Sequence, residues 1–368
     1  MKEINLGRVI MRKRHERGVT QDELAFAMGV SKAAVSKWET GQSYPDITLL
    51  PQLAAFFNIS TDELIGYEPQ MLKEDIRKLY YRLSSEFASR PFEEVLKECE
   101  EIIRKYYSCF PLLRQMALLL LNHVSESGDM DRILEMVVSL CLRVEKEGED
   151  MEDVRQAAFM RACCYLTQQK PEKALEILGE DINPLNQERA MLAQVYLAMG
   201  KSQKAEEVLQ TNMYQYLLSL ISDAVAFVYL KQDDMEKVEE TIQRIRGVID
   251  LYHIESMHPC ATLNFYMVCA QAYCGAEMDE KALGMLKEYV RVCTTSPDLY
   301  SLHGDEYFDR VDAWINNFEL GNKAPKDART IRQSLLAGLT NNPSLSRLAK
   351  KEEFIKMAES LQFKLGGE

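Results

Sequence analysis

The sequence has few of the features that mark membrane, secreted or redox-active proteins. No apolar run is long enough to span a bilayer, because Met116–Leu121 is short and Leu217–Leu230 contains Asp223. The first residues lack the apolar segment of a secretory signal. The nine cysteines form no Cys-x-x-Cys pair, and most lie in apolar helical stretches. We therefore expect a cytoplasmic protein that does not bind membranes and whose thiols are reduced and buried.

Motifs for catalysis and for cofactor binding are also missing. There is no glycine-rich loop for phosphate and no nucleophile elbow. Among the five histidines, His253 and His258 stand five positions apart, so on a helix their side chains would point about 140° apart. They also lack cysteines or carboxylates at the spacing of metal ligands. We expect no metal, no cofactor and no enzymatic activity.

Charged residues are plentiful but unevenly distributed along the chain. The chain has 368 residues, which favours two or more domains, and a net charge of −13. Residues 1–45 contain eight lysines and arginines against five acidic residues, a net charge of +3. The remaining residues therefore carry −16. A basic end on an acidic body is the asymmetry expected of a protein that turns one end toward phosphate.

Residues 1–67 have the pattern of five short helices. Apolar residues at helical spacing and glycine stops predict helices over 5–17, 20–28, 32–39, 45–57 and 60–66. Thr20 with Glu23 and Ser60 with Glu63 have the spacing of capping boxes. The second and third helices are joined by a short turn that contains Gly29, as in a helix-turn-helix unit. The outward face of the third helix would carry short or cationic side chains, as entry into a major groove requires: Lys32, Ala33, Ser36 and Lys37.

This segment resembles the phage-repressor, or Xre, family over essentially all of residues 5–66. The likeness is carried by Thr20-Gln21-x-Glu23-Leu24-Ala25, Gly29-Val30-Ser31-x-x-x-Val35-Ser36-x-Trp38-Glu39-x-Gly41, Pro45, Leu53-Ala54, Phe57 and Ile59-Ser60-x-Asp62-x-Leu64. The resemblance implies that Val35 and Trp38 are core residues and that DNA is contacted by Gln21, Ser31, Lys32, Ala33, Ser36, Lys37, Thr40 and Gly41. Gln21 would hold a phosphate, while Thr40 and Gly41 would face the DNA backbone.

Six positions leave alternatives open. Ala33 stands where several relatives have an amide that reads bases, so its contact would be limited to a thymine methyl group. Lys32 and Lys37 could also be ordinary solvated lysines. Arg12, Arg14 and Arg17 either lie near phosphate or merely solubilise the first helix.

The remainder, residues 73–368 after a linker at 68–72, contains an internal repeat of helical type. Tyr165, Tyr196, Tyr229 and Tyr273 each precede by nine positions a small apolar residue, with a lysine immediately before that residue. A degenerate copy is aligned on Val124. The pattern resembles the tetratricopeptide repeat, with steps of 41, 31, 33 and 44 residues against a usual period of ~34. It predicts an all-α solenoid of helical hairpins that ends in capping helices from about Asn342.

In tetratricopeptide folds the first helix of each repeat lines the concave face, and seven of the ten such positions in this sequence are carboxamides. They are Gln115, Asn122, Gln156, Gln187, Gln194, Asn264 and Gln271. An amide can both donate to and accept from a peptide backbone, so these residues are a candidate effector site. The alternative is simply a polar, wetted surface.

The combined architecture resembles the peptide-responsive regulators of Gram-positive bacteria, a likeness of fold alone. It implies a homodimer on a palindromic operator in double-stranded DNA, with a peptide or protein effector on the repeat domain. The sequence thus predicts a DNA-binding transcriptional regulator. The rival hypothesis is a protein–protein interaction scaffold whose helix-turn-helix head does not read DNA.

Overall fold

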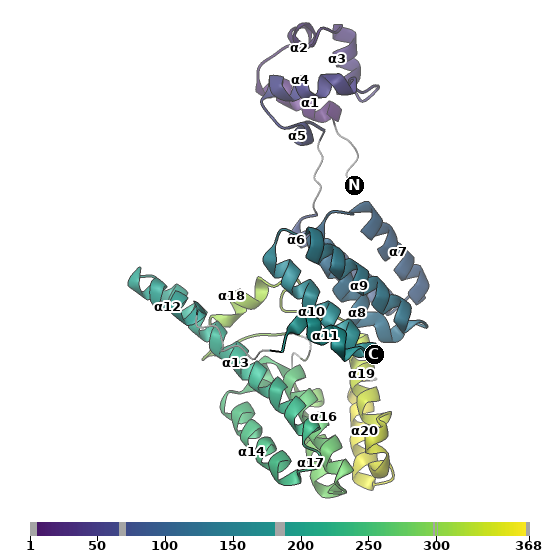
Figure 1. The fold of residues 1–368 in the computed structure, drawn as a ribbon, viewed down its shortest axis with the longest axis vertical. Helices are drawn as coiled ribbons and strands as arrows, with labels where there is room; N and C mark the ends of the chain where they lie inside the picture. Colours follow the sequence, from purple (N-terminus) through teal and green to yellow (C-terminus); the bar gives the residue numbers. More distant parts are fainter. Residues whose placement is uncertain (1–5, 66–70, 181–187, 297–298, 300, 366–368) are drawn as a thin grey trace. The chain divides into compact units, whose positions relative to one another are not determined.

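The computed structural model describes residues 6–65, 71–180, 188–296, 299 and 301–365, and its regular structure is helical (Figure 1). In these residues the only β-type pairing is an isolated bridge between Ser301 and Lys323. The all-α prediction is confirmed. The chain divides into two compact units, which we describe separately: Met1–Ile76 with Glu93–Ile177, and Arg77–Phe92 with Leu178–Glu368. The predicted domain boundaries at 67 and 73 stay a prediction.

The N-terminal helices of unit 1 follow the sequence pattern closely. They are α1 (Leu6–Glu16), α2 (Gln21–Met28), α3 (Lys32–Glu39), the 3₁₀ turn η1 (Ile47–Leu49), α4 (Leu50–Phe57) and α5 (Thr61–Ile65). The fourth helix differs from the prediction because it begins as a 3₁₀ turn, in which the Asp46 side chain accepts from the Thr48 amide. Pro51 then occupies the first turn of α4, where its missing N–H costs no hydrogen bond.

A small core of its own holds these helices together. Leu6 and Ile10 of α1 meet Leu24 of α2, Val35 of α3 and Leu53 of α4, and all are buried. Gly7 lies where α1 crosses the end of α3, and a Cβ there would collide with the backbone carbonyl of Trp38. The absence of a side chain at this position allows α1 and α3 to approach closely.

The rest of unit 1 is built from longer helices. They are α7 (Phe92–Lys105), α8 (Phe110–His123), the 3₁₀ turn η2 (Val124–Glu126), α9 (Met130–Glu147), α10 (Met151–Thr167) and α11 (Pro171–Leu178). α9 packs against both α8 and α10. Arg114 of α8 donates from Nε to Oδ1 of Asp153 on α10 at 2.6 Å, and both residues are buried. This ion pair links the first helices of two successive repeats.

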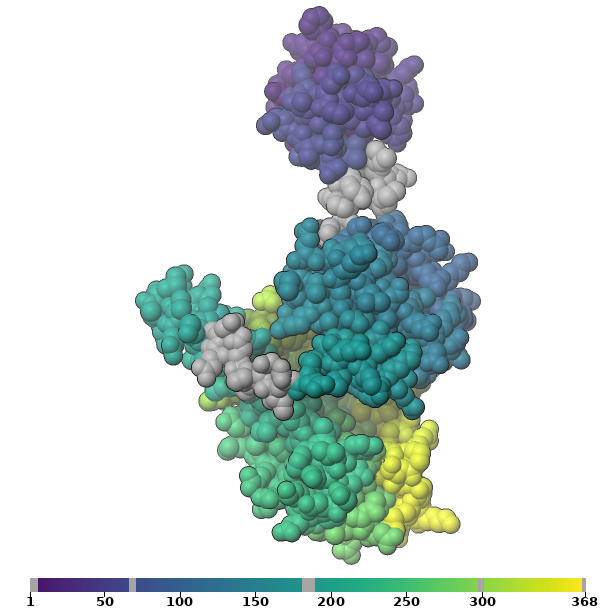
Figure 2. All heavy atoms as spheres, viewed as in Figure 1, coloured from purple at the N-terminus to yellow at the C-terminus, as the bar shows by residue number. Residues whose placement is uncertain are grey.

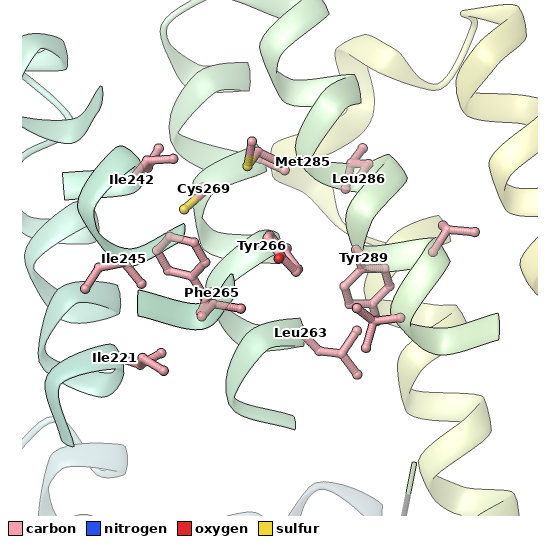
Figure 3. Close-up of a cluster of buried hydrophobic side chains, with 14 of the residues drawn as sticks. Ile221, Ile242, Ile245, Leu263, Phe265, Tyr266, Cys269, Met285, Leu286 and Tyr289 are labelled. Atoms are coloured by element: carbon pink, nitrogen blue, oxygen red, sulfur yellow. The ribbon is translucent and has the colours of Figure 1, made fainter. Parts of the chain in front are cut away.

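Unit 2 receives the second part of α6 (Lys73–Phe87) and all later helices. These are α12 (Glu188–Ala198), α13 (Ser202–Leu230), α14 (Met235–Leu251), α15 (Ile254–Met257), α16 (Pro259–Gly275), α17 (Asp279–Thr295), α18 (Val311–Asn316), α19 (Ala328–Thr340), η3 (Pro343–Leu348) and α20 (Glu352–Leu365). Arg77 and Tyr81 of α6 donate to backbone carbonyls at Glu319 and Leu320. The core centres on α16, whose Phe265 and Cys269 face Ile242 and Ile245 of α14 (Figure 3).

The repeat is visible in the packing. The small residues that the frame marks as close-contact points, Ala174, Ala205, Val238 and Ala282, are all buried. In three frames the lysine beside this residue lies over the frame tyrosine, with Lys173 Nζ 5.5 Å from the Tyr165 ring centroid, Lys204 5.8 Å from Tyr196, and Lys281 5.7 Å from Tyr273. The helical hairpins resemble tetratricopeptide repeats, as predicted.

α13 departs from the regular hairpin pattern. The frame places the second helix of one repeat near Ala205 and the first helix of the next repeat before Tyr229, yet the structure joins them into one helix of 29 residues. Among the described helices, α13 alone is long and apolar enough for a membrane span by length and composition. That test is weak evidence, because core helices of globular proteins also pass it.

Candidate nucleic-acid interface

The exposed face of α3 is the centre of the candidate interface. Ser31 caps this helix, its hydroxyl accepting from the Ala34 amide at 3.3 Å. Val35 and Trp38 are buried against the small core, as predicted. The opposite face is exposed at Ser31, Lys32, Ala33 and Lys37, with Ser36 half-buried beside them. Cationic and short side chains therefore stand together on one side of a slim helix.

The turn before α3 depends on Gly29. This residue ends α2 in the left-handed conformation, with φ of 65°, and its N–H donates to the carbonyls of Ala25 and Phe26. An L-residue with a side chain rarely adopts that φ, so glycine permits the sharp reversal. At the other end of α2, the Thr20–Glu23 capping box is complete. The capping box thus fixes where α2 begins, and Gly29 fixes where it ends and the chain turns toward α3.

A network of buried polar groups anchors the end of α3. Arg14 donates from Nε to Oε1 of Glu39 at 2.6 Å and from Nη1 to the Val19 carbonyl at 2.8 Å. Gln21 donates from Nε2 to Oε2 of Glu39 at 2.7 Å. Burial raises the pKa of Glu39, but the hydrogen bonds from Arg14 and Gln21 outweigh it and leave that pKa below its usual value. Arg14 is thus a buried structural residue, a role that neither of the two alternatives considered from the sequence had included.

Gln21 lies at the edge of this network. One N–H of its amide is used by Glu39, which fixes the side chain near the start of α2. An amide nitrogen carries a second N–H, so the same group can still donate outward. The geometry is compatible with the phosphate contact expected for Gln21, which stays a prediction.

Two features of the interface could not be seen in the sequence. Lys32 Nζ lies 2.7 Å from Oδ2 of Asp22, an exposed ion pair between α3 and α2. The Thr40 amide and hydroxyl both donate to the Ser36 carbonyl, and the Gly41 amide donates to the Trp38 carbonyl. These donors at the end of α3 are therefore occupied by the helix itself. The expected contacts of Thr40 and Gly41 with the DNA backbone remain untested.

The other basic residues of α1 each make a different contact within the helix-turn-helix domain. Arg12 pairs with Glu16 at 3.7 Å on the surface, and Arg17 stacks over the Phe56 ring with its Cζ 5.1 Å from the centroid. Lys13 pairs with the Glu63 carboxylate at 2.9 Å. The Glu63 amide donates to the Ser60 hydroxyl, which is one of the two hydrogen bonds of the predicted capping box.

Comparison with known proteins agrees with this geometry. Residues 10–64 match the model of a helix-turn-helix family. The chain carries a helix-turn-helix domain. Over 70 residues the chain is also 33% identical to the HTH-type transcriptional activator BcrR of Enterococcus faecalis, an alignment that covers 17% of this chain. The chain spans about a third (34%) of the length of that relative.

Several solved structures align with most of this chain. They are Bacillus thuringiensis PlcR in complex with the peptide PapR7 and DNA (15% identity, 78% of this chain and 95% of that one, TM-score 0.29) and the apo form of the competence regulator ComR of Streptococcus vestibularis (13% identity, 81% and 94%, TM-score 0.26). ComR of S. thermophilus with DNA and its signalling peptide ComS gives 14% identity, 78% and 92%, and a TM-score of 0.23. All three TM-scores are below 0.3.

The candidate effector residues of unit 1 lie on α8 and α10. Gln115 is only 2% exposed, and Asn122 is half-buried. Gln156 is exposed, but its Oε1 accepts from Arg114 Nη1 at 2.7 Å and its Nε2 donates to Glu152 at 2.8 Å. The structure therefore uses Gln156 in an internal network and places Gln115 away from the surface.

The candidate effector residues of unit 2 are spread over two helices. Gln194 is exposed on α12, which packs on α13, whereas Asn264 and Gln271 lie two turns apart on α16. Asn264 is exposed and Gln271 is half-buried. Gln187 lies outside the described residues. Within unit 2 only the α16 pair shares one helix, and the effector role of all these amides stays a prediction.

Proposed function

We propose that this protein regulates transcription as a homodimer that reads a palindromic operator. The helix-turn-helix domain would insert α3 into the major groove, where Lys32, Ser36 and Lys37 face the bases. Two copies would dock in successive major grooves, about 34 Å apart. The proposal is carried by one observation: the cationic face of α3 is exposed while its opposite face, with Val35 and Trp38, is buried.

The helical repeats would supply dimer contacts and a site for an effector, for which a peptide is our preferred class. Exposed amides such as Asn264 can pair with a peptide backbone. Such an effector would act only by preferring one spacing of the two heads over another. We propose a cytoplasmic regulator without catalytic activity, and a role in transcription is supported by the relative in Enterococcus faecalis, which is a transcriptional activator.

Replacing Lys32 and Lys37 together by alanine tests the assignment of α3. Retention of operator DNA, found by genomic footprinting and then measured by gel shift, should be lost while the helical signal in circular dichroism is unchanged. Lys350→Ala with Lys364→Ala changes the charge equally at two exposed positions outside the helix-turn-helix domain and is the matched control. Equal binding by both double variants would refute the assignment of α3.

The salt dependence of binding distinguishes the regulator from a scaffold whose head does not read DNA. Each phosphate contact contributes about 0.9 to the slope of log affinity against log salt concentration. A regulator should therefore lose affinity steeply between low and moderate salt. Weak binding that is insensitive to salt would support the scaffold instead.

A further inference from the structure

The chain between α17 and α19 crosses unit 2 with little regular structure. We call residues 301–327 the strap. All of these residues are described, and their only regular elements are the six-residue helix α18 and the isolated bridge between Ser301 and Lys323. Part of the strap lies at the surface, where its yellow-green atoms are visible in Figure 2. A connection this long with so little regular structure is uncommon in a compact domain and is usually functional.

The first part of the strap is attached to the middle of α13 by one side chain. Gln210 is 8% exposed, and its Nε2 donates to Oδ1 of Asp309 at 2.9 Å. Its Oε1 accepts from the backbone amide of Arg310, also at 2.9 Å. The two hydrogen bonds use both ends of the amide group, so a single glutamine holds the strap at the point where α18 begins.

The later part of the strap is attached to α6. Arg77, Tyr81 and Ser84 stand four and three positions apart, so they share one face of that helix. Arg77 donates from Nε to the Glu319 carbonyl at 2.5 Å, and the Tyr81 hydroxyl donates to the Leu320 carbonyl at 2.6 Å. The Ser84 hydroxyl donates to a third carbonyl of the strap at 3.0 Å. Because all three acceptors are backbone groups, these side chains hold the path of the strap itself.

The two attachments are joined by α18. This helix begins directly after Arg310 and ends three positions before Glu319. Its Val311 and Ile315 are buried in the core of unit 2, and it packs on α13. A short helix moves as one piece, because its own hydrogen bonds fix its backbone. A displacement of the strap at α13 is therefore carried to the part of the strap that α6 holds.

The strap also encloses a tyrosine of α13 whose hydroxyl has no partner. Tyr214 is 1% exposed, and its ring meets those of Phe308 and Trp314 edge-on, with centroids 6.0 and 6.3 Å apart. Nothing in the described part of the chain forms a hydrogen bond with the Tyr214 hydroxyl. A buried polar group without a partner costs free energy, and lifting the strap would expose this hydroxyl to water. The closed strap is thus held by Gln210 and opposed by Tyr214.

We propose that the strap is a releasable link that couples α13 to α6, the first described helix after the helix-turn-helix domain in chain order. With the strap closed, Gln210 and the side chains of α6 hold the same segment. With the strap lifted from α13, α6 loses the backbone to which its side chains donate and becomes freer to move. An effector that binds one of these states better shifts the equilibrium between them. This inference rests on the effector-controlled regulator proposed above and assigns a route from its repeats to its DNA-binding domain.

Hydrogen exchange of the full chain, without DNA, tests the link through two changes in α13 that should act in opposite directions. Gln210→Leu removes both hydrogen bonds to the strap, so exchange in the strap and in residues 77–87 of α6 should become roughly tenfold faster. Tyr214→Phe keeps the ring and removes only the unpartnered hydroxyl, so exchange in both segments should become roughly threefold slower. A tyrosine that merely fills the core would give no such slowing.

Gln215→Leu is the matched control for the glutamine variant. It makes the same chemical change on α13, but Gln215 accepts from Arg189 of α12 and donates to the Thr211 carbonyl rather than to the strap. Exchange in residues 77–87 should therefore stay as in the wild type. If Gln210→Leu does not fold, Asp309→Ala removes one of the two hydrogen bonds from an exposed position of the strap and should speed exchange in the same segments.

Breaking the link at α6 completes the test. In a chain that already carries Arg77→Ala with Tyr81→Phe, Gln210→Leu should no longer change exchange in residues 77–87. Faster exchange in the strap alone, with α6 unaffected in the otherwise wild-type chain, would overturn the coupling. Unchanged or faster exchange in Tyr214→Phe would overturn the releasable strap. These measurements contain no DNA, so a failure of the α3 assignment in the gel shift would refute the regulator without deciding the link.

Discussion

Arg14 Nε lies 2.6 Å from Glu39 Oε1, and this contact joins α1 to the last residue of α3. Both side chains are largely buried, and Gln21 of α2 donates to the same carboxylate. One carboxylate therefore connects three helices. The position of the DNA-facing helix depends on an interaction whose residues do not themselves reach the exposed face of α3.

Replacing Glu39 with glutamine should destabilise the helix-turn-helix domain by roughly 1.5–3 kcal/mol at neutral pH, the range for hydrogen bonds to charged groups. The pKa of Glu39 is lowered in the folded state, so its stabilisation is complete above the usual carboxyl pKa and is lost as the pH falls through the lowered value. Hydrogen exchange of α1 to α3 should show this acid-dependent loss in the wild type and much less of it in the variant. Equal protection of both proteins at pH 7 would contradict the role of Glu39.

Replacing Gly7 with alanine should destabilise the same domain by roughly 1–3 kcal/mol, because the added Cβ would collide with the Trp38 carbonyl. Gly247→Ala and Gly284→Ala are matched controls in α14 and α17, where nothing lies within 4 Å of the new Cβ. Those two changes should instead stabilise the protein by about 0.5–1 kcal/mol through helix propensity. Denaturant unfolding measures all three, and a neutral Gly7→Ala would show that α1 can shift away from α3 at no cost.

Replacing Asp22 with asparagine should strengthen DNA binding several-fold at low salt. The change releases Lys32 from its ion pair and removes a negative charge beside the cationic face of α3. Asp62→Asn makes the same charge change at an exposed position on α5 and should have a smaller effect. Gel-shift titrations at two salt concentrations compare the two variants. If they bind alike, the ion pair does not restrain Lys32.

The sequence was most informative where structure depends on near neighbours in the chain. The limits of α2 and α3 follow from Thr20, Gly29 and Ser31, whose caps act within a few residues. The role of Arg14 could not be derived in this way, because its partner Glu39 is 25 positions away and only packing brings them together. The same holds for the burial of Gln115, which was expected on an open face.

The continuity of α13 had a signal that the repeat frame obscured. Between Leu209 and Tyr214 the sequence has no glycine or proline, so nothing in it ends a helix there. The periodic columns indicated two helices, but the local residues favour one. The structure follows the local residues and keeps the buried frame position at Ala205.

Because α13 is unbroken, the direction in which α12 points around the helix axis depends on the number of residues in α13. Each residue inserted near Asn212 would turn α12 about 100° around the helix axis and move it by about 1.5 Å, whereas seven inserted residues would nearly restore its direction. Many different side chains could occupy the exposed positions of α12. The number of residues between Ala205 and Ala224, by contrast, cannot change freely, because it sets the direction of α12 relative to the rest of unit 2.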